Sequence, residues 1–118
     1  MYTNWRGEQG YEAMKVLIER HPSLDAVYCF NDQIAAGAIR AAQEAGRRIP
    51  EDVAILGHDN WDLICNEIHP FISSFDNDLN RIGRTAAHFL IDAINGSPHS
   101  GIIKLNCPLI VRESTERR

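Results

Sequence analysis

Three apolar runs in this chain each end in a cluster of side chains that could hydrogen-bond to a small polar ligand. The runs and the clusters after them are residues 26–30 with Asn31-Asp32, residues 53–57 with His58-Asp59-Asn60, and residues 72–75 with Asp76-Asn77-Asp78. Such a pattern is typical of buried strands in an open parallel sheet, which binds ligands at the carboxyl ends of its strands. Carboxylates accept hydrogen bonds and amides both donate and accept them. The pattern therefore predicts a cleft for a polyhydroxylated small molecule.

Catalysis and metal binding are the alternative uses of these polar clusters. The sequence has no GxSxG, Walker or GxGxxG motif, and the adjacent His58 and Asp59 would point to opposite sides of an extended chain. A Mg²⁺ site for phosphotransfer would have to collect carboxylates from all three clusters, but amides lie between them. Helix capping competes with ligand contact at Asp32 and Asp78. We expect no enzyme, no metal and no cofactor.

Two tryptophans lie close to the polar clusters. Trp5 belongs to the polar segment 4–9 ahead of the first expected helix. Its indole could stack on the apolar face of a sugar or a purine, or it could pack over the end of the sheet. Trp61 follows Asp59 by two residues and has the same two alternatives, with a place at the rim of the cleft.

Composition and charge restrict the class of protein. The 118 residues carry a formal charge of −4, so we expect that this segment does not itself bind nucleic acid. No apolar run approaches the length of a membrane span, and the first residues lack the apolar stretch of a secretory signal. The cysteines are three, an odd number, and are widely spaced at Cys29, Cys65 and Cys107. Reduced thiols in a cytoplasmic protein are the expectation.

The spacing of apolar residues predicts alternating helices and strands. We expect helices over residues 10–20, 33–45 and 79–95, strands over 26–30, 53–56 and 72–75, a loop or short helix over 63–69, and further strands over 102–105 and 109–111. The early strands are continuous apolar runs, which indicates a sheet covered on both faces. The apolar stripe of the last helix should face inward. The predicted fold is α/β, an open, mostly parallel, doubly wound sheet with flanking helices.

Two segments carry a resemblance to a known family. The chain from Leu24 to Ala42, continued by residues 46–60, resembles the lactose/galactose-repressor (LacI/GalR) family of bacterial transcription regulators. The ending from Val111 to Thr115 looks like the C-terminal strand of that family. The resemblance implies a core like the periplasmic sugar-binding proteins, with two lobes behind a helix-turn-helix headpiece.

By this resemblance, residues 1–118 are the C-terminal portion of the effector-binding and dimerisation core. The helix over 79–96 would belong to an N-terminal lobe outside this chain, and the DNA-binding headpiece would also lie outside it. The resemblance places effector contacts at three positions and a stacking aromatic at a fourth: Asn31, Asp59, Asn77 and Trp5. It places the dimer interface at the start of helix 33–45 and at Leu63, Ile64 and Ile68, which could instead form a small satellite core.

Three departures from the family pattern leave the effector open. His58 stands where Tyr or Phe is common, and Asn60 replaces a second Asp. The strand end Phe75-Asp76-Asn77-Asp78 also differs from the commoner family sequence, with Asn77 where Gln is frequent. The main hypothesis is a cytoplasmic, dimeric, ligand-responsive repressor. Its small effector, a sugar or a related metabolite, would change the angle between two lobes and thereby the affinity for operator DNA. The alternative is a fragment of a periplasmic sugar-binding protein that serves a transporter. Neither hypothesis involves a membrane contact by this chain.

Overall fold

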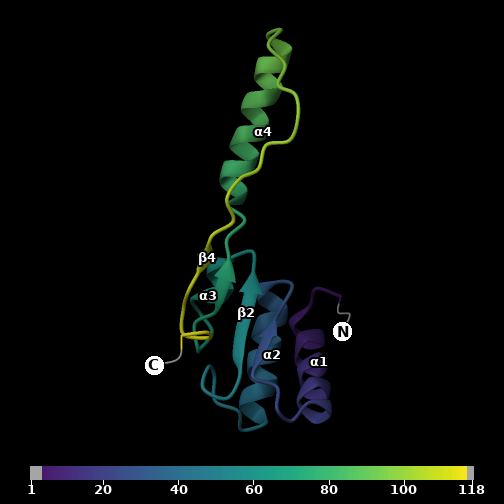
Figure 1. The fold of residues 1–118 in the computed structure, drawn as a ribbon, viewed down its shortest axis with the longest axis vertical. Helices are drawn as coiled ribbons and strands as arrows, with labels where there is room; N and C mark the ends of the chain where they lie inside the picture. The colour runs from purple at the N-terminus through teal and green to yellow at the C-terminus, as the bar shows by residue number, and fades with distance from the viewer. Residues whose placement is uncertain (1–3, 117–118) are drawn as a thin grey trace.

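One open four-stranded sheet organises the part of the chain that this computed structural model describes, residues 4–116 (Figure 1). Its strands, in spatial order, are β1 (Ala26–Tyr28), β2 (Ala54–His58), β3 (Ser73–Phe75) and β4 (Leu109–Ile110). The first three are parallel, with Leu56 opposite Tyr28 on one side and Ser73 on the other, and β4 runs antiparallel to β3. The prediction of an α/β fold with an open, mostly parallel sheet is confirmed.

The described helices lie close to the predicted positions. They are α1 (Gly7–Arg20), α2 (Asp32–Glu44), the short α3 (Asp62–Cys65) and α4 (Leu79–Ile94). The start of α1 is the largest difference, because that helix begins at residue 7 rather than residue 10.

Side-chain caps fix where α2 and α4 begin. Asn31 Oδ1 accepts from Ile34 N at 2.8 Å, and Asp78 Oδ1 accepts from Arg81 N at 3.1 Å. Each bond satisfies one of the backbone donors left unpaired in a first helical turn. The capping alternative is therefore confirmed at Asp78. It is wrong at Asp32, which is the first residue of α2 and uses its carboxylate elsewhere.

The core forms where α2 packs between α1 and the sheet. The inner face of α2 is rich in alanine, and β2 contributes Ile55 to the same cluster. Two glycines let α1 approach α2 closely. A Cβ on Gly37 would lie 1.8 Å from the carbonyl oxygen of Gly7, and a Cβ on Gly10 would lie 2.3 Å from that of Ile34.

Burial along the strands differs from the prediction of a sheet covered on both faces. In β2 the buried residues Ile55 and Gly57 alternate with half-buried ones, and in β1 both Ala26 and Tyr28 are exposed. Among the described residues, one face of the sheet is therefore more open than the other. The continuous apolar runs could not show this difference between the two faces, because they indicate which residues are apolar and not which elements cover them.

The last helix and the segment after it depart furthest from prediction. α4 extends away from the sheet, and the returning chain runs beside it (Figure 1). No residue of α4 is buried, so its apolar stripe does not face a core within residues 4–116. Residues 102–105, predicted as a strand, form none because no strand lies beside them to pair with. No described helix has the length and apolar character needed to cross a membrane.

Replacing Gly37 with alanine should lower the free energy of unfolding by about 2–3 kcal/mol, because the new methyl group forces α1 away from α2. Gly83→Ala is the matched control, since nothing lies within 4 Å of a Cβ there. That change should raise stability by roughly 0.5–1 kcal/mol through the better helix propensity of alanine. Urea unfolding followed by circular dichroism measures both. Equal stability of the Gly37→Ala variant and the parent would contradict the close packing.

Candidate functional site

Two of the predicted ligand-binding residues meet at the carboxyl ends of the strands. Asn77, in the loop after β3, donates from Nδ2 to Asp59 Oδ1 at 2.8 Å. The Asn77 carbonyl oxygen lies 3.0 Å from Nε2 of His58, whose Nδ1 lies 2.7 Å from the hydroxyl of Tyr28. Four polar side chains from three neighbouring strands or their loops thus form one continuous chain of hydrogen bonds.

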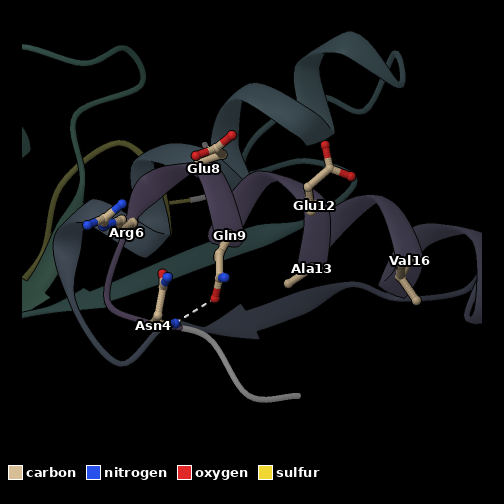
Figure 2. Close-up of a pocket in the computed structure, with 7 residues that line it drawn as sticks. All are labelled: Asn4, Arg6, Glu8, Gln9, Glu12, Ala13 and Val16. Carbon is tan, nitrogen blue, oxygen red and sulfur yellow. Dashed lines mark hydrogen bonds between the residues drawn. The ribbon is translucent and has the colours of Figure 1, made fainter.

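The other two predicted residues form a second pair. Asn31 donates from Nδ2 to the carbonyl oxygen of Trp5 at 3.2 Å while its Oδ1 caps α2. The segment before α1 is also held by a bond from Asn4 N to Gln9 Oε1 at 2.6 Å, which Figure 2 shows. These bonds fix Trp5 in a left-handed backbone conformation with φ of 72°, and its side chain remains 57% exposed.

An aromatic cluster connects the two pairs. The Trp5 ring meets the Phe30 ring edge to face, with centroids 4.8 Å apart, and Phe30 lies parallel to the His58 imidazole at 6.5 Å. Phe30 is 62% exposed, although it ends an apolar run and was expected within a buried strand. Sequence reasoning missed it as a site residue. The available signal was the alternation of sides, since the preceding Cys29 is buried.

A buried carboxylate supports the loop that carries Asp59. Asp32 is 1% exposed and accepts from Trp61 N at 2.7 Å and from Ser74 Oγ at 2.6 Å. Ser74 Oγ in turn accepts from Asn60 N at 3.0 Å. The same loop has positive φ angles, 93° at Asp59 and 50° at Asn60, which non-glycine residues adopt only when their surroundings hold them there.

A second network ties this loop to the C-terminal segment. Arg112 donates to Asn60 Oδ1 at 2.8 Å and to the carbonyl oxygen of Ile72 at 2.9 Å. The Asn60 amide nitrogen donates to Asp76 Oδ2 at 3.1 Å, and Asp76 Oδ1 accepts from Asp78 N at 2.7 Å. The Asn that replaces the family's second Asp therefore acts as a structural link between the loops after β2 and β3.

A hollow of about 630 Å³ opens beside these loops. Its lining residues come from the loops after β2 and β3 and the start of α4: Asp59, Asn60, Trp61, Asp62, Asp76, Asp78, Leu79 and Asn80. Trp61 is among the lining residues, and none of the lining side chains is basic. Nowhere in residues 4–116 do three or more His, Cys, Asp or Glu side chains converge as a metal site would require. The hollow in Figure 2 is separate and contains no predicted ligand-binding residue.

Two thiols, those of Cys29 and Cys65, and the hydroxyl of Tyr28 have a raised pKa and stay protonated near neutral pH. Burial raises the pKa of Cys29 and of Cys65 to about 12, with nearby Asp32 adding to the effect. Partial burial is also the main cause that raises the pKa of Tyr28, which keeps its hydroxyl available as a hydrogen-bond donor. Cys107 is exposed, and its thiol donates to the Asn77 carbonyl oxygen at 3.4 Å.

The residues suggested for dimer contact differ in exposure. Leu63 is 71% exposed on α3. Ile64 and Ile68 are half-buried and pack against the main core, so they do not form a separate satellite core.

Known proteins with similar sequences and structures share this fold. The profile described as a periplasmic binding protein-like domain matches residues 2–115. The NTD biosynthesis operon regulator NtdR of Bacillus subtilis is 37% identical over 110 residues, which are 92% of this chain and 33% of that protein. A LacI family transcriptional regulator from Arthrobacter sp. FB24 in complex with lactose superposes with a TM-score of 0.86 at 34% identity, covering 95% of this chain and 43% of that one.

A third similar structure is a complex with DNA. The lac repressor dimer bound to operator and the anti-inducer ONPF superposes with a TM-score of 0.86 at 25% identity, covering 94% of this chain and 38% of that one. Fold and site thus define a periplasmic binding protein-like effector domain. The chain belongs to the LacI family of transcriptional regulators, in which it corresponds to part of the effector-binding domain. It spans about a third of the length of the curated relatives it matches, which are named as regulators and not as enzymes.

Asp32→Ala should lower the free energy of unfolding by about 2–4 kcal/mol, because it removes the acceptor of the Trp61 amide and leaves the buried Ser74 hydroxyl with only a long bond of 3.4 Å to the Phe75 carbonyl oxygen. Asp62→Ala is the control. Asp62 is exposed and bonds only to Asn66 nearby, so its loss should change stability by no more than about 0.5 kcal/mol. Thermal and urea unfolding give both values. Two variants of equal stability would refute the supporting role of Asp32.

Proposed function

We propose that this chain binds the small effector of a LacI-type repressor, and that the effector is a neutral sugar or a related polyhydroxylated metabolite. The observation that carries the proposal is the hydrogen-bonded pair of Asp59 and Asn77 beside the exposed rings of Trp5 and Phe30. The related regulator from Arthrobacter, whose structure contains lactose, supports the same class of ligand.

The chemistry of the pair suits hydroxyl groups. Only Oδ1 of Asp59 is bonded to Asn77, and Oδ2 has no hydrogen-bond partner among residues 4–116. A free carboxylate oxygen accepts from a hydroxyl, and the second hydrogen of the Asn77 amide can donate to its neighbour. Exposed aromatic rings offer an apolar surface to the C–H face of a sugar ring. For Asn31, whose two polar atoms are engaged, we propose a contribution through the placement of Trp5 in addition to ligand contact.

The charge of the neighbouring hollow argues for a neutral effector. Four of its lining residues are aspartates, and no lysine, arginine or histidine lines it. A phosphorylated or carboxylated ligand would be repelled there, since like charges a few ångströms apart disfavour each other. A sugar without a charged group meets no such penalty.

The exposed face of α4 supports a domain arrangement with a second lobe. Isoleucines and leucines of α4 and of the returning chain are solvent-exposed: Leu79, Ile82, Leu90, Ile91, Ile94, Ile102 and Ile103. An apolar surface of this extent requires a cover. We therefore place residues 1–118 at the C-terminal part of the effector-binding core, with helix 79–96 inside an N-terminal lobe. Operator DNA would be read by a headpiece beyond this chain, as part of a cytoplasmic homodimer.

A periplasmic sugar-binding protein is the second candidate. The description of the matching domain favours it, since that description names periplasmic binding proteins. The named relatives are transcriptional regulators, and this supports the first candidate.

Asp59→Ala should remove effector binding while the fold persists, because the exposed carboxylate supplies the hydroxyl acceptor and no core contact. Affinity for a sugar that binds the parent, found with a panel of neutral mono- and disaccharides that includes lactose, should fall about 10–100-fold. Calorimetry measures the affinity, and a gel-shift assay measures effector-dependent release from operator DNA. Glu12→Ala, in the separate hollow of Figure 2, is the control. Undiminished binding by Asp59→Ala would refute the site.

Leu63→Glu should weaken a homodimer without unfolding the chain, since this side chain is 71% exposed and the new charge would be buried at an interface. Sedimentation velocity should show a shift toward monomer at micromolar concentration. Lys15→Glu places the same charge on the exposed surface of α1 and should leave the mass unchanged. A Leu63→Glu variant with the same mass as the parent would exclude Leu63 from the interface.

A further inference from the structure

When the His58 imidazole is neutral, the hydrogen-bond chain at the strand ends has one consistent direction. A carboxylate only accepts, so the Asn77 amide nitrogen must face Asp59 and its oxygen must face His58. His58 then donates from Nε2 to that oxygen. In a neutral imidazole the other nitrogen, Nδ1, must accept, and the hydroxyl of Tyr28 supplies the hydrogen.

This direction matters because Asn77 has two possible orientations. With the amide turned over, its carbonyl oxygen would face a carboxylate oxygen of Asp59, and two acceptors would be in contact. Asp59 sets this orientation, and the Nε2–H of His58 adds a second hydrogen bond that only the same orientation satisfies, because only the carbonyl oxygen can accept from it. The thiol of Cys107 donates to the same oxygen at 3.4 Å, but thiols are weak donors. His58 is therefore the stronger of the two donors to the Asn77 carbonyl oxygen, while Asp59 holds the amide nitrogen.

We propose that His58 is a positioning residue of the effector site. It fixes Asn77 so that one hydrogen of the amide binds Asp59 Oδ1. The second amide hydrogen and Asp59 Oδ2 then lie side by side and are both available to the ligand. This inference rests on the proposed function, and it narrows the ligand to one with two neighbouring hydroxyl groups. One hydroxyl accepts from the amide hydrogen and the next donates to the carboxylate oxygen.

His58 holds this role by a feature that a phenylalanine lacks. The ring contacts of His58, stacked against Phe30 and tilted against Phe75, would survive a change to Phe. The two hydrogen bonds of the imidazole would not. The polar link from Tyr28 to Asn77 thus depends on the two ring nitrogens of His58.

Two substitutions distinguish the roles of the two ring nitrogens of His58. Glutamine places its amide nitrogen near the position of Nε2, so His58→Gln keeps a donor for Asn77. Asparagine is shorter and reaches only as far as Nδ1, so His58→Asn keeps a partner for Tyr28 and loses Asn77. A merely structural role of His58 would make both variants equally defective. Positioning makes His58→Gln close to the parent and His58→Asn defective.

Nuclear magnetic resonance tests the proposal without any ligand. In the intact protein, ¹⁵N spectra of His58 should show the tautomer protonated at Nε2. Hydrogen exchange of the Asn77 side-chain amide should be slow in the parent and in His58→Gln, and faster in His58→Asn. The opposite tautomer, or slow exchange in His58→Asn, would overturn the proposal.

Sugar binding supplies the second readout. With a sugar from the same panel that binds the parent, His58→Asn should lose about tenfold in affinity, as expected for one hydrogen bond, and His58→Gln should lose little. In a double-mutant cycle, His58→Asn should add nothing to Asn77→Ala. Equal losses in both His58 variants would overturn the positioning role. Normal binding by Asp59→Ala would instead refute the proposed function, and the tautomer result would still stand.

Discussion

The buried carboxylate of Asp32 is the interaction on which the ligand-facing end of the sheet depends. It lies in the first turn of α2, where the helix dipole favours a negative charge, and two short hydrogen bonds replace the water it has lost. These bonds join α2 to Ser74 of β3 and to Trp61 in the loop after β2. Gly57 makes room for it, because a Cβ there would lie 2.2 Å from Asp32 Oδ1. One carboxylate therefore sets the relative positions of three elements.

A second constraint acts from the end of the chain. Ser114 is fully buried, donates from its hydroxyl to the carbonyl oxygen of Ile55 at 2.6 Å, and accepts from Ser73 N at 2.8 Å. The hydroxyl of Ser73 bonds to Arg112 and Thr115. The C-terminal residues thus tie β2 to β3 from one end while Asp32 ties them from the other. The segment from Arg112 to Thr115 consists of polar residues, and yet Ser114 is part of the core.

Which features the sequence could predict depends on how local their causes are. Helix periodicity, the cap at Asp78 and the order of the elements follow from residues close together in the chain, and they were confirmed. The pairing of Asp59 with Asn77 follows from the rule that parallel strands end at one edge. The exposure of Phe30 could have been inferred from the alternation of sides along its strand, but the burial of Asp32 depends on contacts between distant segments, which no local pattern records. The prediction of a strand over residues 102–105 was wrong for the same reason.

The position of Asn77 explains how ligand binding could move α4. Two segments connect the sheet to α4, one over 76–78 and one over 106–108, and a bond from Asp76 N to Pro108 O at 2.9 Å holds them side by side. Asn77 lies on the first segment and contacts Cys107 on the second. A ligand that bonds to both Asp59 and Asn77 acts across this junction. Under the proposed function it would favour whichever angle of α4 gives it both contacts, and a ligand shifts an equilibrium only by such a difference in affinity.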